Sequence, residues 1–388
     1  MDQQEKHMVV GLTFDDVLLL PAYSDFLRSD IDLSTSITRT IRLSLPIVSS
    51  PMDTVTGSDL AIALATLGGI GIIHRNLPIG EQVAEVVKVK AHSAGSGQEK
   101  LLVGAAVGAN KGFEERVEAL AKAGVDIIVV DSAHGFAKSI IDAIVWIKAA
   151  SPSLQVIGGN IATYDGAKAL IKAGADGLRV GMGPGAICTT RIISGMGVPQ
   201  ITAIRETYRA AKEAGVPIIA DGGIKYSGDI VKALAAGASA VMMGSFFASC
   251  LESPGKTVRL NRSQVPHRFL SIFKKDQELY QFKEYRGMGS VGAMQQGANV
   301  KSEDEYHGKS YKDRVLVAEG VEGLVPVKGT VKELVDQALG GMKSGFYYVG
   351  AKSIPELWEK AQFIQITSAS LAESHPHDIL ITNSGENY

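Results

Sequence analysis

The sequence predicts a (β/α)8 barrel, the TIM-barrel class, in which parallel strands alternate with helices around a closed sheet. Eight short apolar runs recur along the chain, and each apolar stretch is closely followed by glycine, serine, aspartate or asparagine. Continuous apolar runs of this length are typical of strands buried on both faces, as in a parallel sheet. Helical stretches lie between the runs, and three of them end in a similar Ala-Gly phrase (AGVD, AGAD or AGAS), which indicates a repeated βα unit. An open doubly wound sheet is the alternative, but so many strands would make it unusually wide.

The candidate strands follow one another with helices between them. In order they are the runs PIVSSPMD, GGIGIIHRN, LLVGAAVG, VDIIVVDSAHG, LQVIGGNIA, DGLRVGMGPG, VPIIADGGI and SAVMMGSFF. Between the third and fourth runs, FEERVEALAKAG places Val117 and Leu120 on one helical face and stops at Gly124. The stretches YDGAKALIKAGA and GDIVKALAAGA follow the same pattern and stop at Gly174 and Gly237.

Two segments interrupt this alternation, although we expect residues 1–388 to form a single barrel domain. Residues 91–100 form a short linker of small residues between the second helix and the third strand. Residues 251–329, after the eighth strand, are long, polar and poorly periodic. A loop of that length is expected to be a functional flap over the mouth, the alternative being a surface excursion. Residues 366–388 form a C-terminal tail.

Composition excludes several classes of protein. The chain has 388 residues, of which 45% are hydrophobic, so a large core is expected. A net charge of −2 gives no reason to expect a nucleic-acid partner. No apolar run approaches the roughly 18 residues that span a membrane, and the polar start lacks a secretion-signal layout. Two cysteines cannot build a disulfide framework, so a cytoplasmic setting is predicted.

Residues that follow the strands of such a barrel form its active face. Around this mouth we expect Ser50, His74, Asp131, Asn160, Cys188, Asp221 and Ser245. Barrels often bind phosphate at the last two loops through backbone N–H groups, which here gives the candidates Gly222, Gly223, Gly244 and Ser245. The alternative is that these glycines only serve tight turns. Asp221 suits ribose hydroxyls better than an anion, so a nucleotide is favoured over a simple sugar phosphate.

Cys188 lies at the end of the glycine-rich loop GMGPGAICTTR, residues 181–191. A thiol among backbone N–H groups and beside Arg191 could become a nucleophilic thiolate. The alternative is a small apolar side chain in a tight turn, and composition alone leaves both open. Cys250 lies in an apolar run and is expected in the core. No histidine or cysteine pair has metal-ligand spacing, so no transition-metal site is expected.

Several motifs together resemble the IMP dehydrogenase/GMP reductase family. They are GLTFDDVLLLP, SSPMDTVT, GGIGIIHRN, VDSAHG, GMGPGAICTTR, GVPQITAI, ADGGI and YRGMGSVGAM, and the tail ESHPHDILITNSGENY resembles that of bacterial dehydrogenases. The resemblance implies that Cys188 attacks C2 of IMP, hydride passes to NAD, and water releases XMP from the covalent adduct. It also implies a potassium ion and a square homotetramer.

The resemblance assigns roles residue by residue. Implied IMP contacts are Ser50, Met52, Asp221, Gly222, Gly223, Gly244, Ser245, Tyr285, Gly287, Met288 and Gly289. Implied NAD contacts are Asp131, Ser132, Ala133, Asn160, Arg179 and Gly181. Potassium would bind carbonyl groups of Gly183, Gly185 and Cys188, together with Glu373 from a neighbouring subunit. Thr190, Glu319 and Tyr306 complete the implied catalytic set with Cys188.

The chain departs from the family pattern at three places. Only residues 91–100 stand where many members carry two regulatory CBS modules, and Ala186 stands where a phosphate-binding serine is common. Glu305 precedes Tyr306 where dehydrogenases carry a flap arginine, although Arg314 could reach the site in a differently folded flap. The missing flap arginine and the missing CBS modules support an alternative, an NADPH-dependent GMP reductase, whereas the residues GSVGAM after YRGM argue against it. A non-catalytic nucleotide-binding scaffold is a third possibility, against which stand the intact Cys188 and Glu319.

Overall fold

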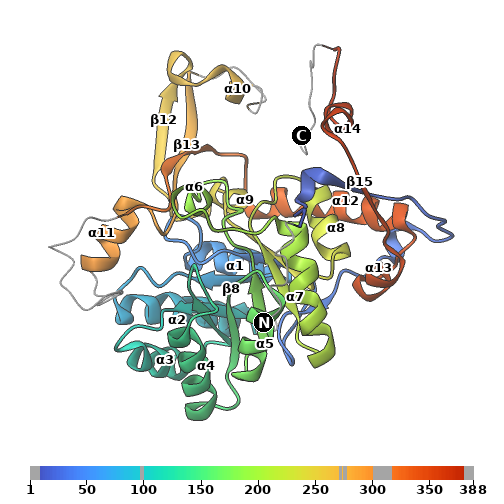
Figure 1. Cartoon of the computed structure of the whole chain (residues 1–388). Helices are drawn as coiled ribbons and strands as arrows, with labels where there is room; N and C mark the ends of the chain where they lie inside the picture. The colour runs from blue at the N-terminus through green and yellow to red at the C-terminus, as the bar shows by residue number, and fades with distance from the viewer. Residues whose placement is uncertain (1–8, 97–99, 271–272, 274–277, 300–316, 380–388) are drawn as a thin grey trace.

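The computed structural model describes residues 9–96, 100–270, 273, 278–299 and 317–379. Within these residues, eight parallel strands close into a barrel in which each strand pairs with the next in sequence. The strands are β4 (Ile47–Ser49), β5 (Ile70–Ile73), β6 (Val103–Val107), β7 (Ile127–Asp131), β8 (Gln155–Ile161), β9 (Gly177–Val180), β10 (Ile218–Asp221) and β11 (Ala240–Met243). The larger helices around it are α1 (Ser58–Thr66), α2 (Ile79–Ser96), α3 (Phe113–Lys122), α4 (Lys138–Ala150), α5 (Tyr164–Lys172), α7 (Gln200–Ala214), α8 (Ser227–Ala235) and α12 (Val331–Val349) (Figure 1). The predicted (β/α)8 barrel is confirmed.

Burial on both faces explains the continuous apolar runs. Ile70, Ile72 and Ile127 pack inside the barrel, whereas Ile73 and Ile128 belong to the cluster between the sheet and the helices. Successive side chains of a strand point to opposite faces, so both sets must be apolar when both faces are covered.

The three predicted glycine stops end their helices as expected. Two residues after α3, α5 and α8, the chain reaches Gly124, Gly174 and Gly237, whose φ angles are +81°, +100° and +119°. Glycine adopts this left-handed conformation without a steric penalty, which ends the helix and turns the chain into the next strand.

The segment at residues 91–100 differs from the expected linker in its first part. Helix α2 continues to Ser96, so residues 91–96 are helical. Two alanines in this stretch favour helix, and the small residues there are not strong enough helix breakers to end α2 at residue 90.

A three-stranded antiparallel sheet, here named the arm, occupies much of the described part of residues 251–329. Its strands are β12 (Thr257–Asn261), β13 (Leu279–Arg286) and β14 (Glu322–Pro326), with α10 (His267–Leu270) and α11 (Val291–Asn299) between them. Val265, Tyr280 and Phe282 are buried together against Phe269 and Phe273. The arm therefore has a small apolar cluster of its own, and it rises from the same end of the barrel as α14 (Ser368–Glu373) (Figure 1).

Shorter elements complete the fold. They are β1 (Val17–Leu19) paired with β15 (Phe363–Gln365), the pair β2 (Thr35–Ser36) and β3 (Arg42–Leu43), the short helices α6 (Thr190–Ile193), α9 (Ser245–Ala248) and α13 (Ile354–Lys360), and 3-10 turns at Phe14–Asp16, Arg28–Asp30 and Arg262–Gln264. Ile37 and Leu43 join the interior cluster, so the β2–β3 pair packs against the inside of the barrel. In the part of the chain described, no helix has both the length and the apolar character needed to cross a membrane.

Candidate active site

The carboxyl ends of the barrel strands bring the predicted mouth residues to one end of the barrel. Ser50 follows β4, Asp131 ends β7, Asp221 ends β10 and Ser245 opens α9 after β11. Cys188 lies in the loop between β9 and α6. This is the end at which barrels of this class carry their active sites.

The loop that holds Cys188 passes close to neighbouring backbone, which its glycines permit. Gly181 has a φ of +152°, and a methyl group placed on it would lie 2.2 Å from the carbonyl oxygen of Asp221. A methyl group on Gly222 would lie 3.3 Å from the amide nitrogen of Gly185. The two glycines therefore allow the loop and the end of β10 to lie against each other.

Cys188, Thr190 and Glu319 form a continuous chain of hydrogen bonds. The thiol of Cys188 lies 3.3 Å from Thr190 Oγ1, and that hydroxyl donates to Glu319 Oε2 at 2.8 Å. The backbone fixes the arrangement, because Thr189 N–H donates to the Glu319 carbonyl at 2.9 Å and Cys188 forms a β-bridge with Gly320. A thiol, a hydroxyl and a carboxylate in this order provide a path by which a proton can move between sulfur and carboxylate.

The other cysteine has a different environment. The side chain of Cys250 is fully buried, as expected, and burial raises the pKa of its thiol. Cys188 is partly exposed at the mouth. Of the two thiols, only Cys188 is therefore placed to meet a substrate.

Three side chains converge on Gly244, at the start of α9. A methyl group on Gly244 would lie 2.8 Å from the Tyr285 hydroxyl, 3.1 Å from the Met52 sulfur and 3.7 Å from the Ser50 hydroxyl. Burial raises the pKa of Tyr285, and the nearby Asp221 and Cys188 raise it further. Tyr285 therefore stays a neutral phenol, able to donate a hydrogen bond at this point.

A line of alternating charges crosses the mouth. Arg179 donates from Nε to Asp221 Oδ2 at 2.9 Å and also forms an ion pair with Asp131. Arg75 Nε lies 3.3 Å from the other oxygen of Asp131. Burial acts to raise the pKa of Asp131, but Arg179 and Arg75 outweigh it and lower the pKa, so this carboxyl is ionised at neutral pH. Asn160 Nδ2 donates to Asp221 Oδ2 at 2.8 Å and to the Gly181 carbonyl at 2.9 Å.

The structure places the remaining candidates as follows. Ser132 and Ala133 follow β7, and Gly287, Met288 and Gly289 follow β13. A methyl group on Gly287 would lie 3.3 Å from the carbonyl oxygen of Ile187, so the end of the arm abuts the Cys188 loop. Tyr306, Glu305 and Arg314 lie outside the described residues. Gly223 lies beside Pro184 of the Cys188 loop.

The potassium candidates divide into two places. Gly183, Gly185 and Cys188 share one loop, whereas the exposed Glu373 ends α14, apart from α6 in the same chain (Figure 1). The Gly185 carbonyl accepts a hydrogen bond from Cys188 N–H at 3.1 Å. Among the residues that the structure describes, the carbonyl groups of Gly183 and Cys188 accept no hydrogen bond.

Two groups at the mouth were missed by sequence reasoning. Arg75 directly follows His74 in the motif GGIGIIHRN, and its position just beyond a strand end was the signal that could have found it. Asp53 directly follows Met52 and pairs with Arg286 at the end of β13. The partners of this pair are so far apart in sequence that no local pattern links them.

Comparisons with known proteins show the family of the chain. The family model for the IMP dehydrogenase / GMP reductase domain matches residues 11–377. The chain is 41% identical to an inosine-5'-monophosphate dehydrogenase of Aquifex aeolicus, covering 100% of this chain and 99% of that protein. It is 43% identical to the protein of the same name from Cryptosporidium parvum, over 99% of both, and 38% identical to that of Escherichia coli K12, over 97% and 98%.

The aligned lengths add one detail. The alignment with the Aquifex protein spans 509 positions and that with the Cryptosporidium protein 419, against 388 residues in this chain. A long part of the Aquifex protein therefore has no counterpart here. The matched family model and the identities over nearly the whole length lead to one conclusion: the chain belongs to the IMP dehydrogenase/GMP reductase family.

Proposed function

We propose that this chain is an IMP dehydrogenase that oxidises IMP to XMP with NAD, the committed step of guanine nucleotide synthesis, through a covalent bond between Cys188 and the purine. The observation that carries the proposal is the hydrogen-bonded chain Cys188–Thr190–Glu319. The loop that holds Cys188 passes beside Gly222 and Gly223, which follow β10. The names of the similar proteins support the same activity.

The nucleotide would be held from three directions. Gly222, Gly223, Gly244 and Ser245 would bind the phosphate, Asp221 the ribose, and the residues at the end of β13 the base, with Ser50 and Met52 opposite. Asp221 Oδ2 already accepts two hydrogen bonds, whereas its Oδ1 accepts none from the described residues, which leaves that oxygen for a ribose hydroxyl.

The proposed chemistry has two stages. Cys188 would lose its thiol proton to solvent, Sγ would bond to C2 of IMP, and C2 would give up its hydrogen as a hydride, for which NAD would supply the acceptor. Water then attacks C2, the bond from sulfur to carbon breaks, and the thiol is regenerated with XMP. Glu319, acting through the Thr190 hydroxyl, would take a proton from that water.

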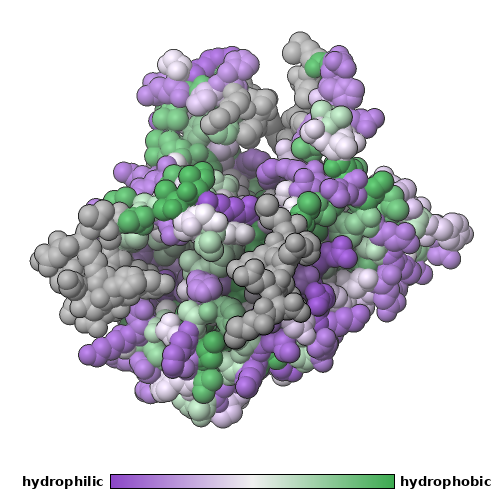
Figure 2. Space-filling model, viewed as in Figure 1, coloured by the Kyte–Doolittle hydropathy of each residue, from purple (hydrophilic) through white to green (hydrophobic). Residues whose placement is uncertain are grey.

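Asp131, Ser132, Ala133, Asn160, Arg179 and Gly181 remain the proposed NAD contacts. A nicotinamide carboxamide needs both a hydrogen-bond donor and an acceptor, and Asn160, Arg179 and Asp131 offer both. Potassium would bind the loop of Gly183 and Cys188, with Glu373 from another subunit. Ile192 and Met196, near this loop, are 84% and 60% exposed and offer an apolar surface for a homotetramer contact. Figure 2 shows hydrophobic surface in the region of α6.

One pair of assays tests the proposal. The protein is mixed with IMP and NAD, and separately with GMP and NADPH, while absorbance of the reduced nicotinamide is followed. We expect the absorbance to rise in the first mixture, to stay constant in the second, and not to change with Cys188→Ala in either. A fall in absorbance in the second mixture alone would show a GMP reductase instead. No change in either mixture would leave a non-catalytic binding scaffold.

A further inference from the structure

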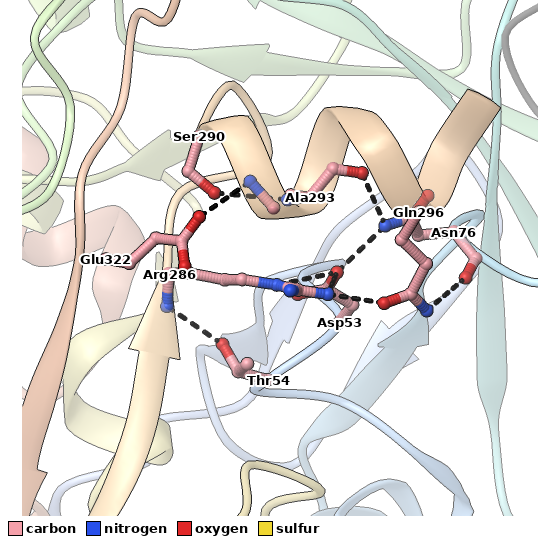
Figure 3. A network of polar contacts seen from close by, with 9 residues as sticks. Asp53, Thr54, Asn76, Arg286, Ser290, Ala293, Gln296 and Glu322 are labelled. Atoms are coloured by element: carbon pink, nitrogen blue, oxygen red, sulfur yellow. Dashed lines mark hydrogen bonds and ion pairs between the residues drawn. The ribbon is translucent and has the colours of Figure 1, made fainter. Parts of the chain in front are cut away.

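Asp53 and Arg286 form an ion pair between two segments that each carry proposed IMP contacts. Asp53 follows Met52 in the loop after β4, and its side chain is only 2% exposed, against 23% for Arg286. Arg286 follows Tyr285 and ends β13. Its Nε lies 3.1 Å from both carboxylate oxygens and its Nη2 lies 2.6 Å from Oδ2 (Figure 3). Paired contacts between a guanidinium and a carboxylate are among the stronger polar interactions and restrict orientation.

Asn76 and Gln296 extend this pair into a set that we name the anchor cluster: Asp53, Asn76, Arg286 and Gln296. Asn76 Nδ2 donates to Asp53 Oδ2 at 2.8 Å and to the Ala293 carbonyl at 3.1 Å. Gln296 Oε1 accepts from Arg286 Nη2 at 2.5 Å, and its Nε2 donates to the Asn76 carbonyl at 3.3 Å. Figure 3 shows the cluster lying between α11 and the loop after β4. The cluster joins the foot of the arm to the barrel.

Arg286 is the cation that balances the buried Asp53. A carboxylate with so little exposure needs a compensating charge or hydrogen bonds. His74 lies near enough to feel Asp53, but burial lowers its pKa to about 4, so it carries no charge at neutral pH. The hydrogen bonds with Asp53 raise the pKa of Arg286, which therefore stays protonated.

Two members of the anchor cluster are next in sequence to the two side chains that come together at Gly244, Met52 and Tyr285. Met52 and Tyr285 both come within about 3 Å of a methyl group placed there, and each is the chain neighbour of one member of the ion pair. Arg286 N–H also donates to Thr54 Oγ1 at 3.2 Å, which fixes the backbone of the arm against the same loop. A shift of either segment would change the space between Met52 and Tyr285.

We propose that Asp53 and Arg286 are positioning residues for the nucleotide: by joining the loop after β4 to the end of β13, they set the gap between Met52 and Tyr285 in which IMP lies. This inference rests on the proposed function and names two residues of the same site that act through Met52 and Tyr285. Neither needs to touch the substrate.

The test compares binding with the intrinsic reactivity of the thiol. For wild type, Arg286→Gln, Asp53→Asn and the double variant, one measures KM for IMP, KM for NAD, the rate of Cys188 alkylation by iodoacetamide, and protection from alkylation by IMP. We expect Arg286→Gln to raise KM for IMP and weaken IMP protection by about 10- to 100-fold, as for a displacement of about 1 Å at a reacting centre. Alkylation without nucleotide should be unchanged.

The double variant Asp53→Asn with Arg286→Gln shows how much of the effect of Arg286→Gln on IMP binding comes from the unpaired Asp53 carboxylate. Arg286→Gln alone leaves the Asp53 carboxylate buried without its cation, whereas Asp53→Asn with Arg286→Gln leaves no unpaired charge. We therefore expect the double variant to bind IMP better than Arg286→Gln, and Arg286→Lys to lie between Arg286→Gln and wild type. Arg209→Gln, which breaks an exposed ion pair with Glu206 on α7, is the matched control and should behave as wild type.

The outcomes are distinct. If Arg286→Gln leaves both KM for IMP and protection by IMP unchanged, the inference is overturned. It is also overturned if the variant loses thermal stability and Cys188 reactivity without nucleotide, and its KM values for IMP and for NAD change alike. If Arg286→Gln does not fold, Arg286→Lys and the double variant decide by the same criteria. If IMP neither protects Cys188 of the wild type from alkylation nor is turned over by it, the proposed function is overturned, and this inference with it.

Discussion

Replacing Thr190 by valine removes one hydroxyl from between a thiol and a carboxylate while keeping the shape of the side chain. That hydroxyl lies 3.3 Å from Cys188 Sγ and donates to Glu319 Oε2 at 2.8 Å, and no other described side chain bonds to this carboxylate. We expect hydrolysis of the covalent adduct to slow in Thr190→Val, because the hydroxyl connects Glu319 to the point at which water attacks. Formation of the adduct should stay fast.

The expected size follows from the bond that is lost. A hydrogen bond to a charged group contributes about 1.5–3 kcal/mol, and each tenfold in rate corresponds to about 1.4 kcal/mol. Hydrolysis should therefore slow by about 10- to 150-fold. Rapid mixing with IMP and NAD measures both stages, since NADH should appear in a burst equal to the enzyme concentration and then accumulate slowly.

Thr190→Ser retains the hydroxyl and is the control, with a steady rate close to that of wild type. Loss of the burst itself in Thr190→Val, with a normal Thr190→Ser, would show that the hydroxyl acts in the attack of sulfur on C2. Our assignment of the Thr190–Glu319 pair to the water step would then be refuted.

Three further predictions concern binding, backbone and pH. Ala186→Ser should lower KM for IMP by about tenfold or more, because it adds a hydrogen bond to the phosphate worth about 1.5–3 kcal/mol; an unchanged KM would mean that the phosphate lies elsewhere. Gly181→Ala should abolish IMP turnover, since its methyl group would lie 2.2 Å from the Asp221 carbonyl oxygen, whereas Gly228→Ala, with open space around it, should be active. Burial lowers the pKa of His74 from 6.5 to about 4, so the folded state takes up this proton less readily than the unfolded state, and stability is lost as pH falls through that range. Between pH 7 and pH 5 the wild type should lose about 2 kcal/mol of unfolding free energy through this group. The unfolding free energy of His74→Leu, measured with urea, should lack this part of the pH dependence.

The barrel could be predicted because its signals are local. A buried strand such as β7 must be apolar on both faces, and Gly124 or Gly174 marks a helix end within a few residues of the pattern that it terminates. The mouth residues followed from the same reasoning, since every parallel strand delivers its carboxyl end to one side of the sheet.

The arm and the anchor cluster could not be predicted because their partners are distant in sequence. The register that pairs Tyr285 with Gly323 joins β13 to β14 across a long intervening segment, and β13 alternates only partly in its burial. Asp53 and Arg286 are 233 residues apart. Roles could be assigned to the site residues only with the help of the family resemblance. Composition alone does not decide whether Cys188 is a small apolar side chain in a turn or a nucleophile.

Because Cys250 is buried, Cys188 is the one accessible thiol of this chain. The sulfur of Cys250 is fully buried and burial raises the pKa of the thiol, so we expect an electrophilic dye or cross-linker to label Cys188 alone. A fluorophore at that position would report on occupancy of the barrel mouth without any cysteine having to be engineered away. The same selectivity suits the chain to screening of covalent fragments by intact-mass spectrometry, in which each adduct would identify its own site.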